Sequence, residues 1–378
     1  MQASSSGRRS RCIATLPAPP RFPSMLPSGF LSMLPSRLHR RVLWLWMFVF
    51  AAAAGTRPLV AETCITQSQM AAPDRGALAD AARSFALNVA ADNTPALRTA
   101  TIPQYAQDFE GIANSVTSAA AHLKGAQMVV RSVYILDASS LKQEPDGRMP
   151  TAQFFCSLNN SPSDTNFTIP GLPPGKYGLA IVDAKGIAAP WQMTFVLQQV
   201  QSRWLLAGFF PKPSTAAGHD GVWYWTQARG YAKKSENWNA WLYYQTAERL
   251  LVPVDFVNST NLEKLRSEAQ AVAPADLKPQ PSAAHPLAVK GSVETFMVTS
   301  LGTDDALGGL DVVAHITATD TSDPVASRKR NVQAMQALLT AHPELSQAFH
   351  GLWIFADAPG KSPFGIELPM AQIAAAAQ

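Results

Sequence analysis

The sequence predicts an α+β fold: N-terminal helices and a run of strands, then a helical hairpin, then a small C-terminal β-β-α-β-β domain. Two observations support this prediction. Apolar residues first recur at a spacing of three to four, which is typical of helices, and from Ala126 onward they alternate with polar residues, which is typical of strands. Helices followed by a run of strands indicate the α+β class.

Residues 1–61 have the character of an export leader. The apolar stretch Val42–Gly55 follows three arginines and a histidine, and its length suits the apolar region of a signal peptide, since a spanning helix needs about 20 residues. Residues 1–32 are either an over-called start, with Met33 as the initiator, or a polar extension. We expect Sec-type export to the periplasm or beyond; a retained N-terminal anchor is the alternative.

The charge balance changes once the leader is set aside. The leader holds eight arginines and no acidic residue, so 23 basic and 27 acidic side chains remain in the rest of the chain. A mildly acidic protein lacks the positive surface that binds phosphate backbones. We therefore expect no nucleic-acid partner. Because the apolar stretch belongs to the leader, we also expect no membrane span after signal cleavage.

Two cysteines, Cys64 and Cys156, lie outside the leader. In an oxidising compartment such a pair favours one disulfide; two unpaired, buried thiols are the alternative. A lone pair of cysteines does not make a zinc site.

The block 62–212 contains the helices and most of the strands. Apolar periodicity predicts a helix across Ala77–Val89 and a second across Pro103–Leu123. The strand candidates, rich in β-branched and aromatic residues, are Met128–Leu136, Ala152–Leu158, Tyr177–Val182, Trp191–Gln199 and Ser202–Phe210. The last two are expected to form a long antiparallel hairpin.

This order of elements, together with the final strand sequence Trp204–Phe210 (WLLAGFF), resembles the nuclear transport factor 2-like superfamily. In that superfamily helices cover a curved sheet to make a cone, so the resemblance implies a cone-like, curved antiparallel sheet covered by the N-terminal helices here. The resemblance implies that the mouth of the cone binds a small apolar molecule. It also implies a route to catalysis, because enzymes of this fold place an acid or base in an apolar cavity that raises its pKa.

The residues that suit such a catalytic role are Asp92, Tyr105 and Asp108, all on or beside the predicted helices. Tyr105 and Asp108 are three residues apart and share a helix face. No histidine falls on the strands of this block, although enzymes of the superfamily commonly pair an acid with a base. We therefore expect a non-catalytic protein rather than an enzyme.

The block 213–262 resembles one tetratricopeptide repeat, a hairpin of two helices. The positions that fall close to its spacing, with alanine in place of the usual glycine and the proline displaced by about one, are Tyr224, Ala228, Tyr231, Ala240, Tyr244, Ala247 and Pro253. Only one copy is present, and a repeat of this kind is not stable alone, so the hairpin is expected to pack on a neighbouring domain.

Four aromatic residues of this hairpin have no place in its own predicted core: Trp223, Trp238, Trp241 and Tyr243. Flat rings offer apolar area with polar edges. These side chains are expected either to dock the hairpin within this chain or to contact a protein partner or ligand.

The remaining segments are a linker at 263–288, rich in proline and alanine, and a small α/β domain at 289–378. In that domain Asp323-Pro324 marks a helix start, with a capping residue followed by an N1 proline. Its predicted strands are Thr295–Ser300, Asp311–Thr317, Gly351–Ala356 and Phe364–Leu368. The residues after Met370 are expected to form an alanine-rich tail.

No complete catalytic, cofactor or metal motif is present, and we predict no cofactor and no metal site. Gly360-Lys361-Ser362 lacks the earlier glycine of a phosphate-binding loop. The aspartates Asp304, Asp305 and Asp311 surround a Gly-rich loop, but His315 stands where a calcium loop needs glutamate, so a solvated turn is preferred.

The sequence therefore favours a non-catalytic binding or interaction protein of the bacterial envelope, whose partner is a protein or a small apolar ligand. The alternative is a small-molecule cyclase or isomerase that uses an acidic residue in an apolar cone.

Overall fold

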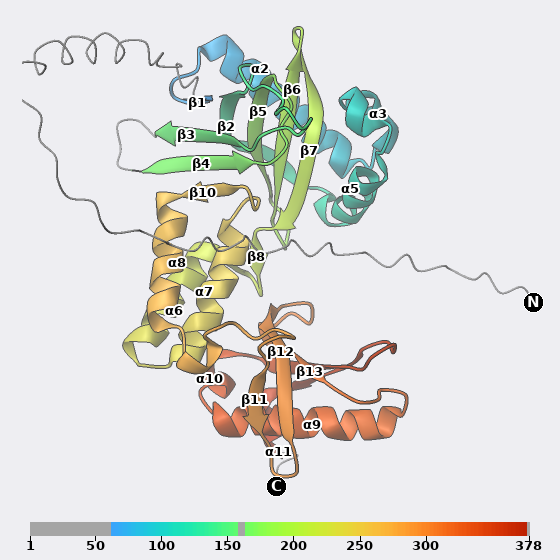
Figure 1. The fold of residues 1–378 in the computed structure, drawn as a ribbon, viewed down its shortest axis with the longest axis vertical. Coiled ribbons are helices and arrows are strands. Elements are labelled where there is room, and N and C mark those ends of the chain that lie inside the picture. Colours follow the sequence, from blue (N-terminus) through green and yellow to red (C-terminus); the bar gives the residue numbers. More distant parts are fainter. Residues whose placement is uncertain (1–61, 158–162, 376–378) are drawn as a thin grey trace, which may run out of the picture. The chain divides into compact units, whose positions relative to one another are not determined.

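The computed structural model describes residues 62–157 and 163–375. They belong to one compact unit, Val60–Gln378. The predicted leader, 1–61, lies outside the described residues, and so do its export signal and its start. The α+β class is confirmed by helices and antiparallel sheets along the described chain (Figure 1).

The largest element of the N-terminal part is a five-stranded antiparallel sheet in the order β1-β2-β5-β6-β7. Its strands are β1 (Thr63–Thr66), β2 (Gln127–Asp137), β5 (Lys176–Lys185), β6 (Trp191–Val200) and β7 (Arg203–Pro213). The predicted final hairpin is present as β6 and β7, paired from Trp191–Pro213 to Val200–Arg203.

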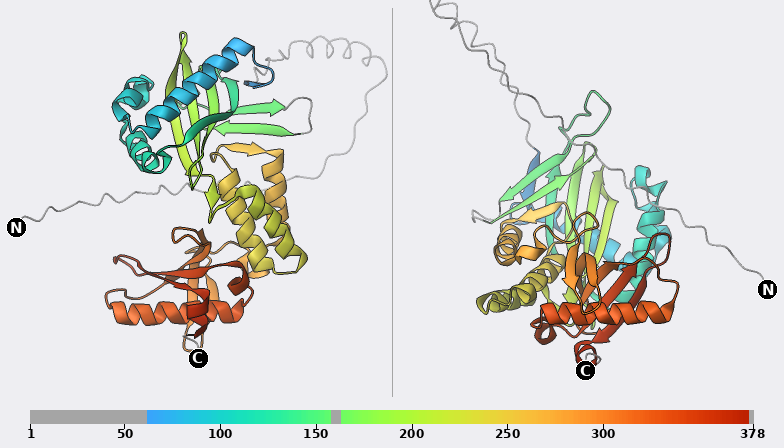
Figure 2. Two further views of the ribbon diagram at one scale, coloured as in Figure 1. Left: turned by 180° about the vertical axis from the view of Figure 1, so that it is seen from behind. Right: turned by 60° about the horizontal axis from the view of Figure 1, so that its bottom comes forward.

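Helices pack on one face of this sheet, and Figure 2 (left) shows α2 lying across it. Four helices lie between β1 and β2 in the chain, namely α2 (Ala72–Ala90), α3 (Thr94–Thr99), α4 (Pro103–Ala106) and α5 (Glu110–Leu123), and α4 has no buried residue. The second predicted helix is thus broken into α4 and α5. Gly178 on β5 permits the close approach of α2, because a Cβ there would lie 2.4 Å from Leu78 Cδ1.

The space between helices and sheet is filled by side chains. Phe85 of α2 and Phe195 of β6 have ring centroids 6.2 Å apart, and Phe195 stacks on Phe209 of β7 at 5.2 Å. All three are at most 7% exposed. The space between helices and sheet is therefore a packed apolar core, and the cone shape stays a prediction.

The opposite face of the sheet carries a second, smaller sheet in the order β10-β4-β3. Its strands are β3 (Ala152–Ser157), β4 (Asp164–Ile169) and β10 (Val257–Ser259). Strand β4 was not predicted. A disulfide between Cys64 and Cys156 joins β1 of the large sheet to β3 of the small one.

Three helices follow the sheets: α6 (Gly221–Lys233), α7 (Asn237–Leu251) and α8 (Thr260–Val272), preceded by the two-residue strands β8 (Thr215–Ala216) and β9 (His219–Asp220). The first two helices form the predicted hairpin, and Asp220 caps α6 by accepting a hydrogen bond from the Trp223 amide. Helix α8 occupies the start of the predicted linker 263–288, because Leu262, Leu265 and Ala269 bury one face of it.

The C-terminal part is a five-stranded sheet in the order β11-β12-β13-β14-β15, with α9 packed on it. Its strands and helices are β11 (Leu287–Lys290), β12 (Thr295–Asp304), β13 (Asp311–Thr317), α9 (Pro324–Ala341), α10 (Leu345–Ala348), β14 (Gly351–Asp357), β15 (Phe364–Pro369) and α11 (Met370–Ala375).

The predicted β-β-α-β-β order of this part corresponds to β12, β13, α9, β14 and β15, and β11 is an additional edge strand. Strands β13 and β14 are parallel, and α9 forms the crossover between them. The predicted C-terminal tail begins as α11, whose Ile373 is buried. Within residues 62–157 and 163–375, no helix is long and apolar enough to cross a membrane.

Candidate functional site

Most of the aromatic residues that were predicted from the sequence to contact a partner are buried in the protein interior. Trp238, Trp241 and Tyr243 on α7 are 4–5% exposed, and Trp223 on α6 is half-buried and stacks on His219 with centroids 3.7 Å apart. Two of them connect α7 to the C-terminal part. The Trp238 ring stacks on His342 at 3.7 Å, and Tyr243 OH donates a hydrogen bond of 2.7 Å to the carbonyl oxygen of Ala348.

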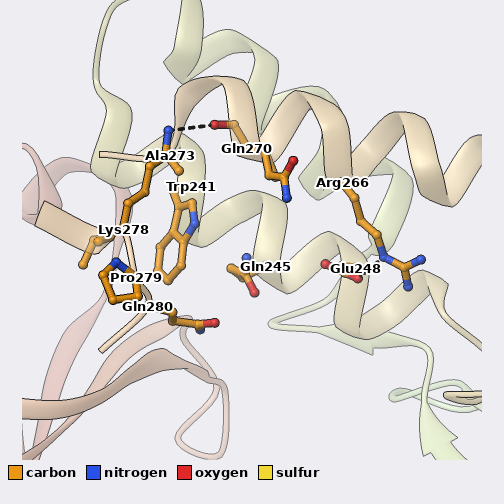
Figure 3. Close-up of a pocket in the computed structure, with 11 residues that line it drawn as sticks. Trp241, Gln245, Glu248, Arg266, Gln270, Ala273, Lys278, Pro279 and Gln280 are labelled. Atoms are coloured by element: carbon orange, nitrogen blue, oxygen red, sulfur yellow. Dashed lines mark hydrogen bonds and ion pairs between the residues drawn. The ribbon is translucent and has the colours of Figure 1, made fainter. Parts of the chain in front are cut away.

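The third, Trp241, lies in the wall of a pocket of about 640 Å³, shown in Figure 3. Helix α7 contributes Trp241, Gln245 and Glu248, which share one face because they are four and three residues apart. Helix α8 contributes Arg266 and Gln270 to the opposite wall. The segment after α8 closes one end with Leu277, Lys278, Pro279 and Gln280.

The pocket wall combines apolar surface with unused hydrogen-bonding groups. Arg266 and Glu248 form an ion pair of 2.5 Å between the helices, and Lys278 Nζ donates to the Gln270 carbonyl oxygen at 3.1 Å. The side-chain amides of Gln245, Gln270 and Gln280 make no hydrogen bond within the described residues. Each amide therefore has a free donor and a free acceptor to offer a ligand.

The residues suggested for catalysis do not gather in an interior cavity. Asp92, Tyr105 and Asp108 are all exposed, Tyr105 at 43%. Asp92 has a left-handed backbone (φ 50°) at the end of α2 and accepts a hydrogen bond of 3.1 Å from Thr117 Oγ1. The side chains that fill the sheet–helix interior are apolar instead.

A second group of polar side chains lies at one end of strands β13, β14 and β15 of the C-terminal sheet, and of this group only Asp311 was considered from the sequence. Asp311 begins β13, His350 directly precedes β14, and Glu367 belongs to β15. Their ligand-type atoms all lie within 4.8 Å of one another. The sheet register explains the convergence, because β13 and β14 start together as a parallel pair and β15 runs back toward the same edge.

Asp311 is the centre of this group and is fully buried. Its Oδ1 lies 2.9 Å from Nδ1 of His350, and its Oδ2 accepts a hydrogen bond of 3.0 Å from Trp353 Nε1. Glu367 Oε1 is buried and has no hydrogen-bond partner in the part of the chain that the structure describes. Burial and the Asp311 carboxylate raise the pKa of Glu367, whereas His350 lowers it.

Two glycines make room for this group. A Cβ on Gly309 would lie 2.5 Å from the Cβ and Cγ of His350. A Cβ on Gly351 would lie 2.5 Å from Glu367 Oε1 and 3.1 Å from Asp311 Oδ1. Glycine at both positions is the local sequence signal for a crowded polar site, although glycine is too common to identify one by itself.

The aspartates of the preceding loop have separate structural roles. Asp304 Oδ1 accepts a hydrogen bond of 2.8 Å from the amide of Ala306, and Asp305 Oδ2 accepts one of 2.8 Å from the amide of Ala217. Of the three aspartates, only Asp311 belongs to the cluster with His350 and Glu367.

Comparison with protein-family models, with curated proteins and with solved structures gave no match. The function of the chain is therefore argued from the geometry of its own sites.

Proposed function

We propose that this chain is an exported, non-catalytic binding protein of the bacterial envelope, and that the pocket beside Trp241 holds a peptide segment of a partner protein. The observation that supports this proposal is the set of three free glutamine amides around an apolar wall. Each peptide unit of a ligand presents one donor and one acceptor, which is what a glutamine amide complements.

The size and the walls of the pocket suit such a ligand. Binding pockets typically measure about 300–1,000 Å³ and combine apolar lining with a few placed polar groups, and this pocket has about 640 Å³. The apolar part comes from Trp241, Leu277 and Pro279. Charges of both signs at the wall, from Arg266, Lys278 and Glu248, suit the mixed polarity of a peptide better than a wholly apolar molecule.

Export rests on the leader in the sequence, and a disulfide between Cys64 and Cys156 is compatible with an oxidising compartment. The proposal that the chain is non-catalytic is supported by the positions of Asp92, Tyr105 and Asp108. These residues are exposed and separate from the apolar interior.

Selection of peptides from a displayed random library on the purified protein tests the proposal. We expect selected peptides to bind with a measurable Kd, followed by tryptophan fluorescence, and to bind the double variant Gln245→Ala/Gln270→Ala at least tenfold more weakly. Loss of two ligand hydrogen bonds, each worth about 0.5–1.5 kcal/mol, accounts for a loss of that size.

Gln336→Ala, a half-buried glutamine on α9 away from the pocket wall, is the matched control and should bind like the wild type. Unchanged affinity of the double variant would exclude this pocket. Binding of an apolar dye that Gln245→Ala does not weaken, with no peptide selected, would favour the small apolar ligand instead.

A further inference from the structure

Three side chains at the edge of the C-terminal sheet form a cluster that the peptide-binding proposal does not use. Asp311, His350 and Glu367 come from three adjacent strands or strand ends, and they offer two carboxylates and one imidazole within 4.8 Å of one another. A structural role is clear for part of the cluster: Asp311 accepts from Trp353 and pairs with His350. That role leaves Glu367 unexplained.

Glu367 is the observation that points to a ligand. Its Oε1 is buried and has no hydrogen-bond partner among the described residues, and its carboxylate lies within 4.8 Å of a second carboxylate, that of Asp311. An unpaired buried carboxylate oxygen next to a like charge is unfavourable unless a proton neutralises one carboxylate or a cation joins the two. His350 Nδ1 faces Asp311 Oδ1, and no hydrogen bond connects it to Glu367 within the described residues.

A second histidine–aspartate pair in the same sheet shows what a purely structural pair looks like. His315 Nδ1 lies 2.8 Å from Asp357 Oδ2, and both side chains are about two-fifths exposed. In the described part of the chain, no third ligating side chain joins that pair. The Asp311 cluster differs from it by a fully buried carboxylate and by the third ligand, Glu367.

We infer that Asp311, His350 and Glu367 bind a divalent transition-metal cation of the zinc class. One imidazole nitrogen among carboxylate oxygens suits zinc and its neighbours, whereas calcium and magnesium prefer oxygen ligands alone. Bonds of about 2.1 Å to one ion place neighbouring ligand atoms about 3.0–3.4 Å apart. The separation of 2.9 Å between Asp311 Oδ1 and His350 Nδ1 is close to that requirement.

The surroundings of the cluster fit the same assignment. Trp353 Nε1 holds Asp311 Oδ2 and leaves Oδ1 to face the cation, as hydrogen bonds to metal-ligating carboxylates do in protein sites. The His350 side chain is 47% exposed, so an ion has access from solvent. Three protein ligands leave at least one coordination position for water or a further ligand.

Zinc titration of the chelator-treated, untagged protein tests this inference. We expect one Zn²⁺ per chain by isothermal titration calorimetry, and a rise in melting temperature when Zn²⁺ is added. Glu367→Gln keeps the shape of the side chain but removes its charge, and should weaken zinc binding at least tenfold. His350→Ala should weaken it at least as much and abolish the thermal shift.

His315→Ala is the matched control, because it removes the histidine of the pair that lacks a third ligand, and it should bind Zn²⁺ like the wild type. Far-UV circular dichroism of the zinc-free variants checks that they fold; Asp311 is avoided because its carboxylate also holds Trp353. The inference is overturned if no one-to-one binding is seen, if Glu367→Gln and His350→Ala bind like the wild type, or if His315→Ala loses zinc equally.

Discussion

Glu268 on α8 is the residue that joins the three helices of the middle part of the chain. Its carboxylate accepts hydrogen bonds from Arg229 Nε at 2.7 Å and Nη2 at 2.8 Å, from Trp225 Nε1 at 2.8 Å, and from Tyr244 OH at 3.3 Å. The Arg229 guanidinium also lies 4.5 Å from the centre of the Trp225 ring. The hydrogen bonds from Arg229, followed by that from Trp225, lower the pKa of Glu268 to about 2.

This low pKa predicts a pH-dependent contribution to stability. A carboxylate with a depressed pKa stabilises the fold fully above its unfolded pKa, and the contribution is lost as pH falls toward the folded pKa. For Glu268 that interval lies between its ordinary 4.5 and about 2. Glu268→Gln should therefore lower the free energy of unfolding by about 1–3 kcal/mol at pH 7, since it weakens charged hydrogen bonds, and should cost much less at pH 2, where Glu268 is at its folded pKa.

Urea unfolding of the wild type and of Glu268→Gln at pH 7, 4 and 2 measures how the contribution of Glu268 to stability changes with pH. Glu263→Gln on the same helix is the control, because Glu263 is exposed and, within the described residues, accepts one side-chain hydrogen bond, of 2.8 Å, from Asn258. A deficit in Glu268→Gln that is independent of pH would mean that its charge is not the cause.

At the scale of the element, sequence reasoning succeeded where a local signal was complete. Asp323 does cap α9, accepting hydrogen bonds from the amides of Val325 and Ala326, as its position before Pro324 predicted. Sequence reasoning failed where tertiary contacts decide whether a strand forms. Strand β4 has only Thr165 and Phe167 buried among polar residues, so its alternation is too weak to detect without its partners β3 and β10.

Helix α7 is the element whose docking has the clearest energetic consequence. Trp238 is 4% exposed and stacks on His342 of the C-terminal part, and burial lowers the pKa of that histidine. Trp238→Ala should lower the free energy of unfolding by about 3–5 kcal/mol, because it removes a large buried ring and leaves a cavity.

Trp223→Ala provides the comparison within the same hairpin. Trp223 is half-buried and stacks on His219, which is exposed, so its loss should cost clearly less than the loss of Trp238. Urea denaturation curves give both values. Equal stability of Trp238→Ala and the wild type would contradict the docking contact and would return Trp238 to the set of residues available for a partner.

At the scale of the whole molecule, the sites come from residues that the sequence holds far apart. Asp311 and His350 are 39 residues apart and Glu367 lies on a third strand, so only the register of β13, β14 and β15 brings them together. The Trp241 pocket likewise needs α8, which was hidden in a segment that its prolines and alanines marked as a linker. Spacing rules apply within one helix or strand, so neither convergence is visible in the sequence.

The disulfide is the long-range link that the sequence did suggest, and it leads to a prediction for the molecule as a whole. Cys64 and Cys156 are 92 residues apart, and the bond connects the edge strand β1 to β3 of the other sheet. In the chain-entropy model, closing a loop of that length stabilises the folded state by about 4–5 kcal/mol. The double variant Cys64→Ala/Cys156→Ala should lose stability of that order.

Urea unfolding with and without dithiothreitol distinguishes the bond from a pair of buried thiols. The reductant should shift the wild-type curve to lower urea and leave the double variant unchanged, because only the former has a bond to break. An unshifted wild-type curve, after prolonged reduction in the unfolded state, would mean that the cysteines are not paired. Mass spectrometry of protein recovered from the periplasm, alkylated before and after reduction, extends the test to the cell: if the protein is exported, both thiols should be protected until reduction, since that compartment is oxidising.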